Sequence, residues 1–582
     1  MLKRILPPII VIIASFFSVF HFNKFAFEHD LKYRPLANGW VSIYPGFHLD
    51  STLTVGDKIK KIVDSDLVHG RFRPAFFTYI SSSYFLSPIL HKRMSELGNR
   101  DFSKLMTGDL RIFSLILLSS VSLSLIMISF LVYRYTGTWV YSFLPILFVP
   151  LSLSLTENLL QNYIDSQEIP LVFWCSLWFY FFFSSIYPDI TGKKQALYWA
   201  LSLIALTIAF LTKETTIVLA GVTGIQAIIS YLHNTRKESL GGTRRVCIAS
   251  TFLITVLLAG IVIYITMHNK TGYAGAYKVD VEGVVTAVKE VWKFIARFSL
   301  VHPFGYLAVF LGIATILFNR RREIYDSYAS VHFQLFLTLF LSAAGFYAII
   351  LPWRPFLMKY TFPTVFFFSF LVAFSLALID RSLKQKIAKF RWIIVFCLLT
   401  PFLVLFFSIQ KKATVARDYI AVEANYGVSI LPQIAKDIVK VTEETGKETL
   451  NVMVLYQAGE KWRNSIAWSG LHLMRWLNFE HGMNIIDKNG NVINELTMQK
   501  NKLELTSFKY DTHKPSVYIA ENKSKLLTRP FDVIYQAYLD KETPVQMIDT
   551  PYGEYQQVAR VAEYPKKPFF QPFIVYRYLL SH

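Results

Sequence analysis

Residues 196–232 read ALYWALSLIALTIAFLTKETTIVLAGVTGIQAIISYL, an apolar stretch whose only charged residues are Lys213 and Glu214. As one helix, at 1.5 Å per residue, this stretch would be about 55 Å long. The hydrocarbon core of a bilayer is only ~30 Å thick. The stretch therefore predicts two membrane spans that meet at a sharp turn, with Lys213-Glu214 at the break.

Similar apolar segments recur along the first 410 residues. Since roughly 20 apolar residues suffice for one helical span, the sequence predicts a polytopic α-helical membrane protein with about 11 transmembrane helices. Lys3 and Arg4 precede the first segment as in a signal peptide, but no small-residue cleavage site follows, so we expect an uncleaved span. The segments are 5–22, 111–133, 138–156, 168–186, 196–212, 215–232, 246–267, 303–318, 332–351, 359–379 and 392–409.

The composition agrees with a membrane protein. Of the 582 residues, 53% are hydrophobic and 17% charged, against about 25% charged in ordinary soluble proteins, and the mean hydropathy is +0.37. These values exclude a disordered chain or a plain cytosolic globular protein. The three cysteines lie in apolar runs, which argues against a disulfide framework and a cysteine zinc site.

The distribution of basic residues predicts the orientation. The net charge of +20 suits cytoplasmic loops that face anionic lipid, and no interleaved basic and aromatic strip indicates a nucleic-acid partner. Counted from a cytoplasmic N-terminus, inner loops carry clusters such as 320–322 and 381–391, whereas the outer loop 157–167 has no Lys or Arg. An odd number of spans then places the C-terminus outside. We expect a multi-pass protein of a bacterial inner membrane, with an endoplasmic-reticulum location as the open alternative.

Two large segments face outward in this arrangement, the first loop, 23–110, and the tail, 411–582. The tail has the composition of a soluble domain, with apolar residues at helical spacing over 428–442. Helices that alternate with apolar strands predict a small extracytoplasmic α/β domain over 411–582, after a membrane module over 1–410. The expected strands are 449–456, 515–520, 531–537 and 573–578.

The first candidate site is FAFEHD, residues 25–30, directly after the first span. A carboxylate such as Glu28 or Asp30 can act as a general base on a hydroxyl nucleophile. Two close carboxylates could also hold a divalent cation with water ligands. The alternative is that these charges only form the hydrophilic end of the first span.

Basic residues form the next candidates. Arg71 and Arg73 lie in HGRFRPAFF, residues 69–77. Their planar guanidinium groups suit bidentate phosphate binding, although an ordinary basic loop before an interfacial helix would look the same. Lys213, at headgroup depth, can attract a lipid phosphate. Alternatively, it can pair with Glu214 and only mark the turn between two helices.

A later motif, LPWRP at 351–355, is followed by Lys359-Tyr360 and by Pro363 in the next span. Arg354 and Lys359 are candidates for phosphate binding, or interfacial anchors of the usual Trp and Arg kind. The acidic stretch 157–168 could bind sugar hydroxyls or help to hold a metal, or form a solvated turn. The candidates for acceptor or sugar binding are Glu157, Asp165, Glu214 and His69.

In this order, the motifs of residues 1–410 resemble the GT-C superfamily of membrane glycosyltransferases. Its members include protein O-mannosyltransferases and bacterial transferases that add aminoarabinose to lipid A. The family's acidic motif often has two adjacent acids, whereas His29 separates them here, so either Glu28 or Asp30 can be the base. The matching features are the acidic motif that opens a long outer loop, the 212–214 hairpin, and Arg354, Lys359-Tyr360 and Pro363.

The resemblance implies an enzyme that moves a sugar from a polyprenyl-phosphate carrier to an acceptor on the outer face, with inversion at the anomeric carbon. The acceptor is a glycan, a lipid or a protein. Asp30 would be the base and Glu28 its orienting partner or substitute. The resemblance implies no certain cofactor, and a need for a divalent cation stays open. The groups that would receive the carrier phosphate are Lys213, Arg354, Arg71, Arg73 and Lys359.

Three other functions stay open. A membrane glycan polymerase or ligase would use similar carriers, but it usually relies on a large Arg/His-rich loop late in the chain. A lipid-linked sugar transporter or flippase would often show internal repeats and helices broken at the membrane midplane, and no repeat is visible. A non-catalytic membrane scaffold is the third.

Overall fold

The computed structural model describes most of the membrane helices and the core of the C-terminal sheet. The chain forms two compact units, and within the last long helix the boundary lies between Arg417 and Asp418. The described residues are 2–23, 60, 63–64, 67, 73–76, 78, 102–160, 167–234, 242–268, 284–285, 288–289, 298–322, 327–351, 358–384, 391–455, 473–474, 477–478, 481–493, 495–496, 506–507, 510–522, 529–539, 544–564 and 573–581.

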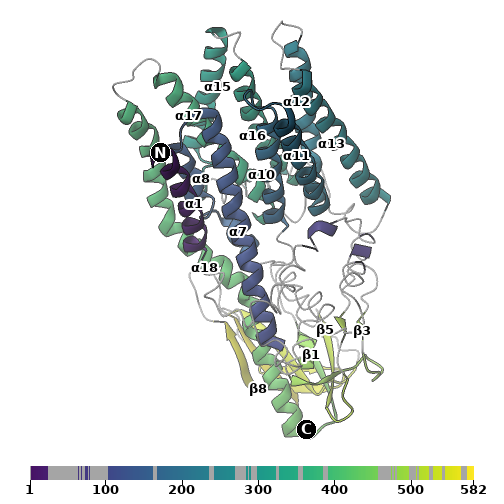
Figure 1. Cartoon of the computed structure of the whole chain (residues 1–582). Coiled ribbons are helices and arrows are strands. Elements are labelled where there is room, and N and C mark those ends of the chain that lie inside the picture. The colour runs from purple at the N-terminus through teal and green to yellow at the C-terminus, as the bar shows by residue number, and fades with distance from the viewer. Residues whose placement is uncertain are drawn as a thin grey trace. The chain divides into compact units, whose positions relative to one another are not determined.

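Helices dominate the first unit (Figure 1). This is expected because a helix satisfies its own backbone hydrogen bonds, which lipid cannot do. The α-helices are α1 (Leu2–Phe22), α7 (Phe102–Thr136), α8 (Phe143–Phe148), α9 (Leu153–Leu160), α10 (Glu168–Ser185), α11 (Gly192–Thr212), α12 (Val218–Asn234), α13 (Gly242–His268), α15 (Pro303–Arg322), α16 (Ser327–Ile350), α17 (Phe362–Lys384) and α18 (Arg391–Thr445). The 3-10 helices are η1 (Val140–Ser142), η2 (Glu214–Ile217) and η3 (Met358–Thr361).

Eight described helices are long and apolar enough to cross a membrane, and the bent pair Val140–Phe148 and Leu153–Leu159 raises the number to nine. Two more of the predicted spans correspond to shorter apolar helices, Leu6–Phe22 and Pro303–Leu317. Each of the eleven predicted segments thus has a helical counterpart, and the multi-pass helical architecture is confirmed. The count of eleven spans is not, because the apolar parts of those two helices are shorter than the apolar stretch of a full crossing.

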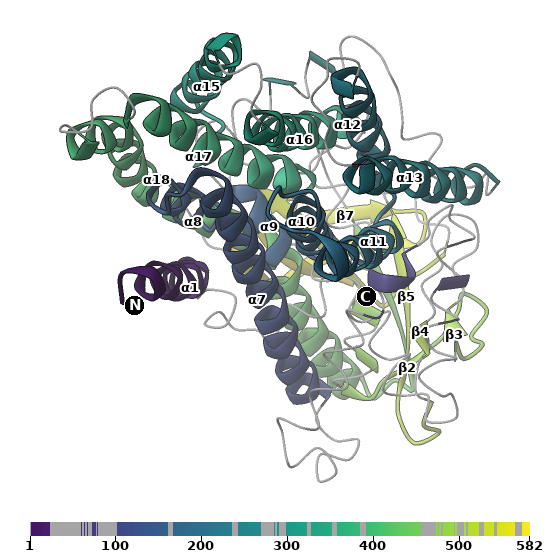
Figure 2. The ribbon, with the colours of Figure 1, turned by 45° about the horizontal axis from the view of Figure 1, so that its top comes forward.

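Helix α17 forms the centre of the first unit, since an apolar window of 18 residues within Lys359–Leu383 is completely buried. It packs against α10, α15 and α16, and Figure 2 shows α15 and α16 beside it. A helix that is apolar all round is expected in such a central position. By contrast, only 22% of the apolar window of α18 is buried, so this helix presents apolar side chains such as Phe396 and Phe407 to lipid.

Two helix breaks place polar groups inside this apolar unit. The first is a 50° bend between α8 and α9. Helix α1 satisfies carbonyl groups there: Ser18 Oγ donates to the Ile146 carbonyl at 2.6 Å, and Asn23 Nδ2 donates to the Pro150 carbonyl at 3.2 Å. The bend is thus stabilised by side chains from the start of the chain.

The second break lies between α11 and α12, at the predicted position. Helix α11 ends at Thr212, and Lys213 is extended, with φ −159° and ψ 138°, before η2 begins. The Thr216 hydroxyl donates to the Lys213 carbonyl at 2.7 Å and lies 3.0 Å from the Ala209 carbonyl. These hydrogen bonds satisfy backbone groups that the break frees from the helix.

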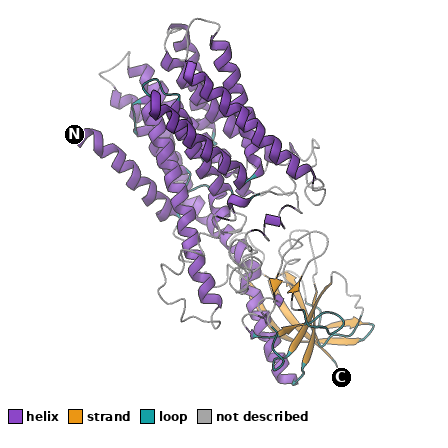
Figure 3. Ribbon diagram, turned by 45° about the vertical axis from the view of Figure 1, so that its right-hand side comes forward, coloured by secondary structure: helices purple, strands orange, loops and turns teal. Residues whose placement is uncertain are grey.

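A seven-stranded mixed sheet forms the second unit, in the order β2-β5-β1-β6-β9-β8-β7. Strands β2, β5, β1 and β6 are parallel, while β9, β8 and β7 continue the sheet in antiparallel fashion. The strands are β1 (Thr449–Leu455), β2 (Asn484–Ile485), β5 (Ser516–Asn522), β6 (Val533–Leu539), β7 (Met547–Thr550), β8 (Gly553–Tyr564) and β9 (Phe573–Leu580), and a separate pair joins β3 (Glu495–Leu496) to β4 (Thr506–Ser507). Helix α18 adds the expected α/β character (Figure 3).

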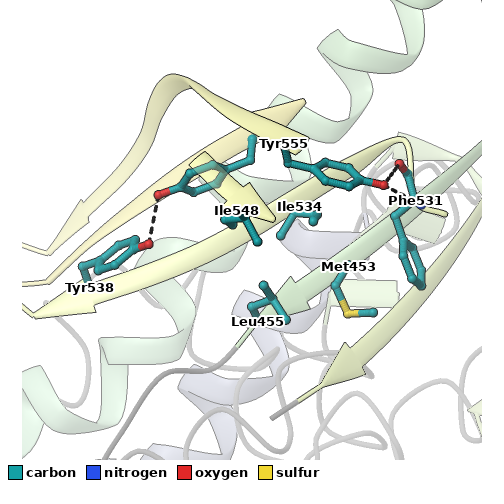
Figure 4. Close-up of a cluster of buried hydrophobic side chains, with 8 residues drawn as sticks. Met453, Leu455, Phe531, Ile534, Tyr538, Ile548 and Tyr555 are labelled. Atoms are coloured by element: carbon teal, nitrogen blue, oxygen red, sulfur yellow. Dashed lines mark hydrogen bonds between the residues drawn. The ribbon is translucent and has the colours of Figure 1, made fainter. Parts of the chain in front are cut away.

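Aromatic side chains with satisfied hydroxyl groups fill the core of this sheet (Figure 4). The Tyr555 hydroxyl donates to the Phe531 carbonyl at 2.7 Å, and the Tyr578 hydroxyl donates to the Val545 carbonyl at 2.8 Å. Because these bonds offset the cost of burying polar groups, tyrosine can serve as a core residue here. The other members of the cluster are Met453, Leu455, Ile534, Tyr538 and Ile548.

Candidate functional site

A buried ion pair marks the candidate site. The Nζ atom of Lys213, at the break after α11, contacts the Oε1 atom of Glu168, the first residue of α10. The side chains of Lys213 and Glu168 are only 6% and 1% exposed. Charges removed from water are costly unless they are paired, so this pair holds both groups inside an otherwise apolar unit.

The ring of Tyr360, in η3, is close to the ammonium groups of two lysines. The Nζ atom of Lys213 is 4.4 Å from the centroid of the Tyr360 ring, and the Nζ atom of Lys359 is 5.1 Å from the same centroid. Lys359 is completely buried. An aromatic face attracts cations within about 6 Å, more strongly when they are desolvated. We call Glu168, Lys213, Lys359 and Tyr360 the lysine cluster.

Helix α9 fixes the backbone of η3 and thereby the two lysine-cluster residues that η3 carries. Asn158 Nδ2 lies 3.0 Å from the Lys359 carbonyl and 2.9 Å from the Ser154 carbonyl. The hydroxyl groups of Ser154 and Thr361 are 2.7 Å apart. Glu157, next to Asn158, is also buried, with 3% of its surface exposed. The bent segment α8–α9 therefore positions the start of α17.

The structure brings together some of the predicted site residues. Lys213 and Lys359, 146 positions apart in the sequence, face one ring, and Glu157 lies on the helix that holds η3 in place. Glu214 is half-buried in η2, and Lys213 contacts Glu168 instead of pairing with it. The alternative in which Lys213 and Glu214 form an ion pair at the turn between two helices is thus wrong.

For the other predicted residues, the structure gives less information about their positions. Arg73 is described and buried, and its carbonyl accepts a hydrogen bond from the Phe76 N–H at 3.1 Å. Six of the predicted site residues lie outside the described residues: Glu28, Asp30, His69, Arg71, Asp165 and Arg354. Within the described residues, no group of three or more His, Cys, Asp or Glu side chains could hold a metal ion.

Sequence analysis missed the role of Glu168. In the sequence, Glu168 is only the last residue of the acidic stretch 157–168, and that position alone assigns it no role. A signal was present, because a carboxylate at the first position of a very apolar helix is costly without a cationic partner. Sequence alone could not supply that partner, since Lys213 lies 45 positions further along the chain.

A second polar cluster lies at the opposite ends of α10 and α17, and its contacts are structural. The Tyr135 carbonyl, in the last turn of α7, contacts Arg381 Nη1 at 3.2 Å and His332 Nε2 at 2.5 Å. Arg134 donates to the Ser184 hydroxyl at 2.9 Å, and Arg244 donates to the Pro188 carbonyl at 2.5 Å. Cationic side chains commonly satisfy carbonyl groups at helix C-termini, so these contacts require no ligand.

These features define a multi-pass helical membrane protein with polar helix breaks at one end of its bundle and a C-terminal sheet domain. No protein-family model matches the chain, and no curated protein does. Solved structures similar to it include that of ArnT from Cupriavidus metallidurans in the apo state, with a TM-score of 0.39 and 12% identity over 75% of this chain and 79% of that chain.

Two crystal structures of the Archaeoglobus fulgidus oligosaccharyltransferase are also similar. The complex with zinc and sulfate gives a TM-score of 0.36 and 13% identity, and the form tethered to an acceptor peptide gives 0.37 and 12%. Each match covers 70% of this chain, but only 53% and 55% of the archaeal chains.

Proposed function

We propose that the protein is a membrane glycosyltransferase that moves a sugar from a polyprenyl-phosphate carrier to a hydroxyl group of a glycan, lipid or protein acceptor. The observation that carries the proposal is the lysine cluster: two buried ammonium groups on one tyrosine ring, at helix breaks in an apolar bundle. A ligand with an anionic head and an isoprenoid tail matches this combination, because the lysines suit the phosphate and the apolar helices suit the tail.

The proposed reaction combines the lysine cluster with the acidic motif at residues 28–30. The acceptor oxygen attacks the anomeric carbon and forms the new C–O bond, while the bond from that carbon to the phosphate oxygen breaks and its electron pair stays on the phosphate. The acceptor proton passes to Asp30, with Glu28 as its orienting partner or substitute. Attack from the side opposite the phosphate inverts the anomeric centre. Lys213 and Lys359 stabilise the charge that develops on the departing phosphate, because fixed cations in a dry site do so better than water.

The remaining predicted residues complete the proposal. Arg71, Arg73 and Arg354 are further candidates for contact with the carrier phosphate, and Glu157, Asp165, Glu214 and His69 for contact with the sugar or the acceptor. A divalent cation, if the reaction needs one, would be held by the acidic motif at residues 28–30. The proposed location is a bacterial inner membrane, with the site and the C-terminal domain on the outer face.

The test is transfer of radiolabelled sugar from polyprenyl-phosphate donors in membranes that contain the wild type or a variant at equal expression. Loss of a catalytic base costs about 10²–10⁴-fold in rate, so we expect Asp30→Asn to lose the product. We expect Lys213→Gln to reduce kcat/KM about 10²-fold or more, as removal of a charge-stabilising donor does. Asp189→Asn and Lys193→Gln, both at exposed positions, are the matched controls.

The outcomes separate the alternatives. Activity lost in Glu28→Gln but kept in Asp30→Asn would move the base to Glu28. Full activity in both, or no transfer by the wild type with any of several sugars and acceptors, would reject the enzyme. In that case, movement of a labelled lipid-linked sugar across vesicles would indicate a transporter, and its absence a scaffold.

A further inference from the structure

Glu168 is bound to Lys213 through one oxygen only. Its Oε1 atom contacts the lysine, while its Oε2 atom, also buried, has no hydrogen-bond partner among the described residues. A buried acceptor without a donor is costly, because it has lost its hydrogen bonds to water. The ion pair is therefore only partly satisfied, unlike a bidentate structural pair.

Lys213 has donor capacity that Glu168 does not use. An ammonium group carries three N–H donors, and the ammonium group of Lys213 contacts one carboxylate oxygen and the face of the Tyr360 ring. A phosphate that enters the lysine cluster would bring several acceptor oxygens to this ammonium group. Carboxylate and phosphate would then compete for the same cation.

We infer that Glu168 is the exchange partner of Lys213: it binds the lysine before the carrier enters, is displaced from it by the carrier phosphate, and binds it again when the spent carrier leaves. This inference rests on the proposed function, since it takes the carrier phosphate as the ligand of Lys213. Glu168 thereby acts as a positioning residue, through Lys213, and does not touch the sugar.

The chemistry of the carrier explains why an exchange partner is needed. The sugar-loaded carrier is a phosphodiester with one negative charge, whereas the spent carrier is a phosphate monoester with about −1.5 to −2 charges near pH 7. Fixed cations therefore hold the product more tightly than the substrate. A carboxylate that competes for Lys213 weakens product binding and keeps the site from being trapped with spent carrier.

The experiment measures the Kd of purified full-length protein in detergent for farnesyl phosphate, a short analogue of the spent carrier, and for farnesol, which lacks the phosphate. We expect Glu168→Gln to tighten farnesyl phosphate binding about tenfold, as the loss of one close charge interaction allows, and to leave farnesol binding unchanged. Lys213→Gln weakens farnesyl phosphate binding, and the double variant binds it as Lys213→Gln alone does, because Glu168 acts only through Lys213.

Two further variants serve as a conservative substitution and as a control. Glu168→Asp retains the charge but shortens the reach to Lys213, so it tightens binding in the same direction, by less, and it serves if Glu168→Gln does not fold. Glu444→Gln removes a carboxylate from an exposed pair with Lys440 and leaves both affinities unchanged.

The inference is overturned if Glu168→Gln weakens farnesyl phosphate binding or leaves it unchanged, or if its effect persists in the Lys213→Gln background. A different result would count against the proposed function itself: if Lys213→Gln does not weaken farnesyl phosphate binding, the lysine cluster is not the phosphate site. Weaker binding in Lys213→Gln without tighter binding in Glu168→Gln would keep the proposed function and reject only the exchange.

Discussion

Asp437, near the end of α18, is the residue that joins this helix to the sheet of the second unit. Its Oδ1 atom accepts a hydrogen bond from Arg577 Nη1 at 3.1 Å, on β9, and its Oδ2 atom accepts one from the Tyr535 hydroxyl at 2.8 Å, on β6. Burial and the nearby Asp437 charge raise the pKa of Tyr535 well above its usual value. One carboxylate therefore ties a helix to two strands.

We expect Asp437→Asn to destabilise the sheet of the second unit by about 2 kcal/mol, since it leaves the largely buried Arg577 without its counter-ion; this is less than the 3–5 kcal/mol of a fully buried pair. Amide hydrogen exchange in β6 and β9 measures the change. The control is Glu444→Gln, whose exposed pair should contribute about 0.5 kcal/mol or less. Equal effects of the two variants would contradict the anchoring role of Asp437.

His481 should make the second unit sensitive to acid. Burial, and then the positive charge of Lys436, lower the pKa of this histidine in the folded protein. Below about pH 6.5, the ordinary histidine pKa, the unfolded chain binds a proton that the folded chain does not, so stability falls as the pH falls. His481→Gln should reduce this loss between pH 6.5 and pH 5, as denaturant unfolding monitors. His513→Gln, at an exposed position, should not.

The candidate site could be predicted from sequence only where a residue breaks a local pattern. Lys213 interrupts a long apolar run, and Lys359 precedes another, so both stood out in the sequence. The pairing of Lys213 with Glu168 and the shared Tyr360 ring could not be predicted, because they join residues from three separate elements. The roles assigned to Asp30 and Arg354 stay predictions.

At the scale of elements, glycine permits a close contact between two helices of the first unit. A Cβ atom at Gly312 of α15 would lie 2.7 Å from the Cβ atom of Ser375 of α17 and 3.2 Å from its Cα atom. The backbones of α15 and α17 approach each other here because neither large nor branched side chains intervene, as is common between membrane helices.

We expect Gly312→Ala to force α15 and α17 apart and to cost about 1–3 kcal/mol, as overpacking of a tight contact does. The midpoint of thermal unfolding in detergent measures this cost. Gly260→Ala is the control, because no atom lies within 4 Å of its added Cβ atom. The second change Ser375→Gly should restore much of the loss; a Gly312→Ala variant as stable as Gly260→Ala would contradict the close packing.

The elements themselves were largely predictable. Apolar runs of about 20 residues indicated the membrane helices, and short apolar runs indicated β1, β5, β6 and β9. Strand β8, GEYQQVARVAEY, was missed because its charged and polar residues hide the pattern. The continuity of α18 was missed too: the span 392–409 and the helix 428–442 belong to one helix of 55 residues, because the polar stretch between them is rich in helix-forming residues.

At the scale of the whole molecule, the excess of basic residues in alternate loops predicts on which side of the membrane each part lies. In a variant whose three native cysteines are serine, we expect Glu444→Cys to react with a membrane-impermeant maleimide in spheroplasts. Lys193→Cys should react only after lysis. Both positions are exposed, so accessibility differs only through the membrane. The reverse pattern would invert the orientation and place the C-terminal domain in the cytoplasm.

The contacts of α1 with the bend between α8 and α9 can form only after the ribosome has synthesised both segments. Ser18 and Ile146 are separated by 128 residues, which a ribosome takes roughly 6–25 s to add at about 5–20 residues per second. The first span therefore waits in the membrane without its partner for that long. Asn23 can meanwhile donate to the Val19 carbonyl of its own helix, a bond of 2.9 Å that the finished protein retains.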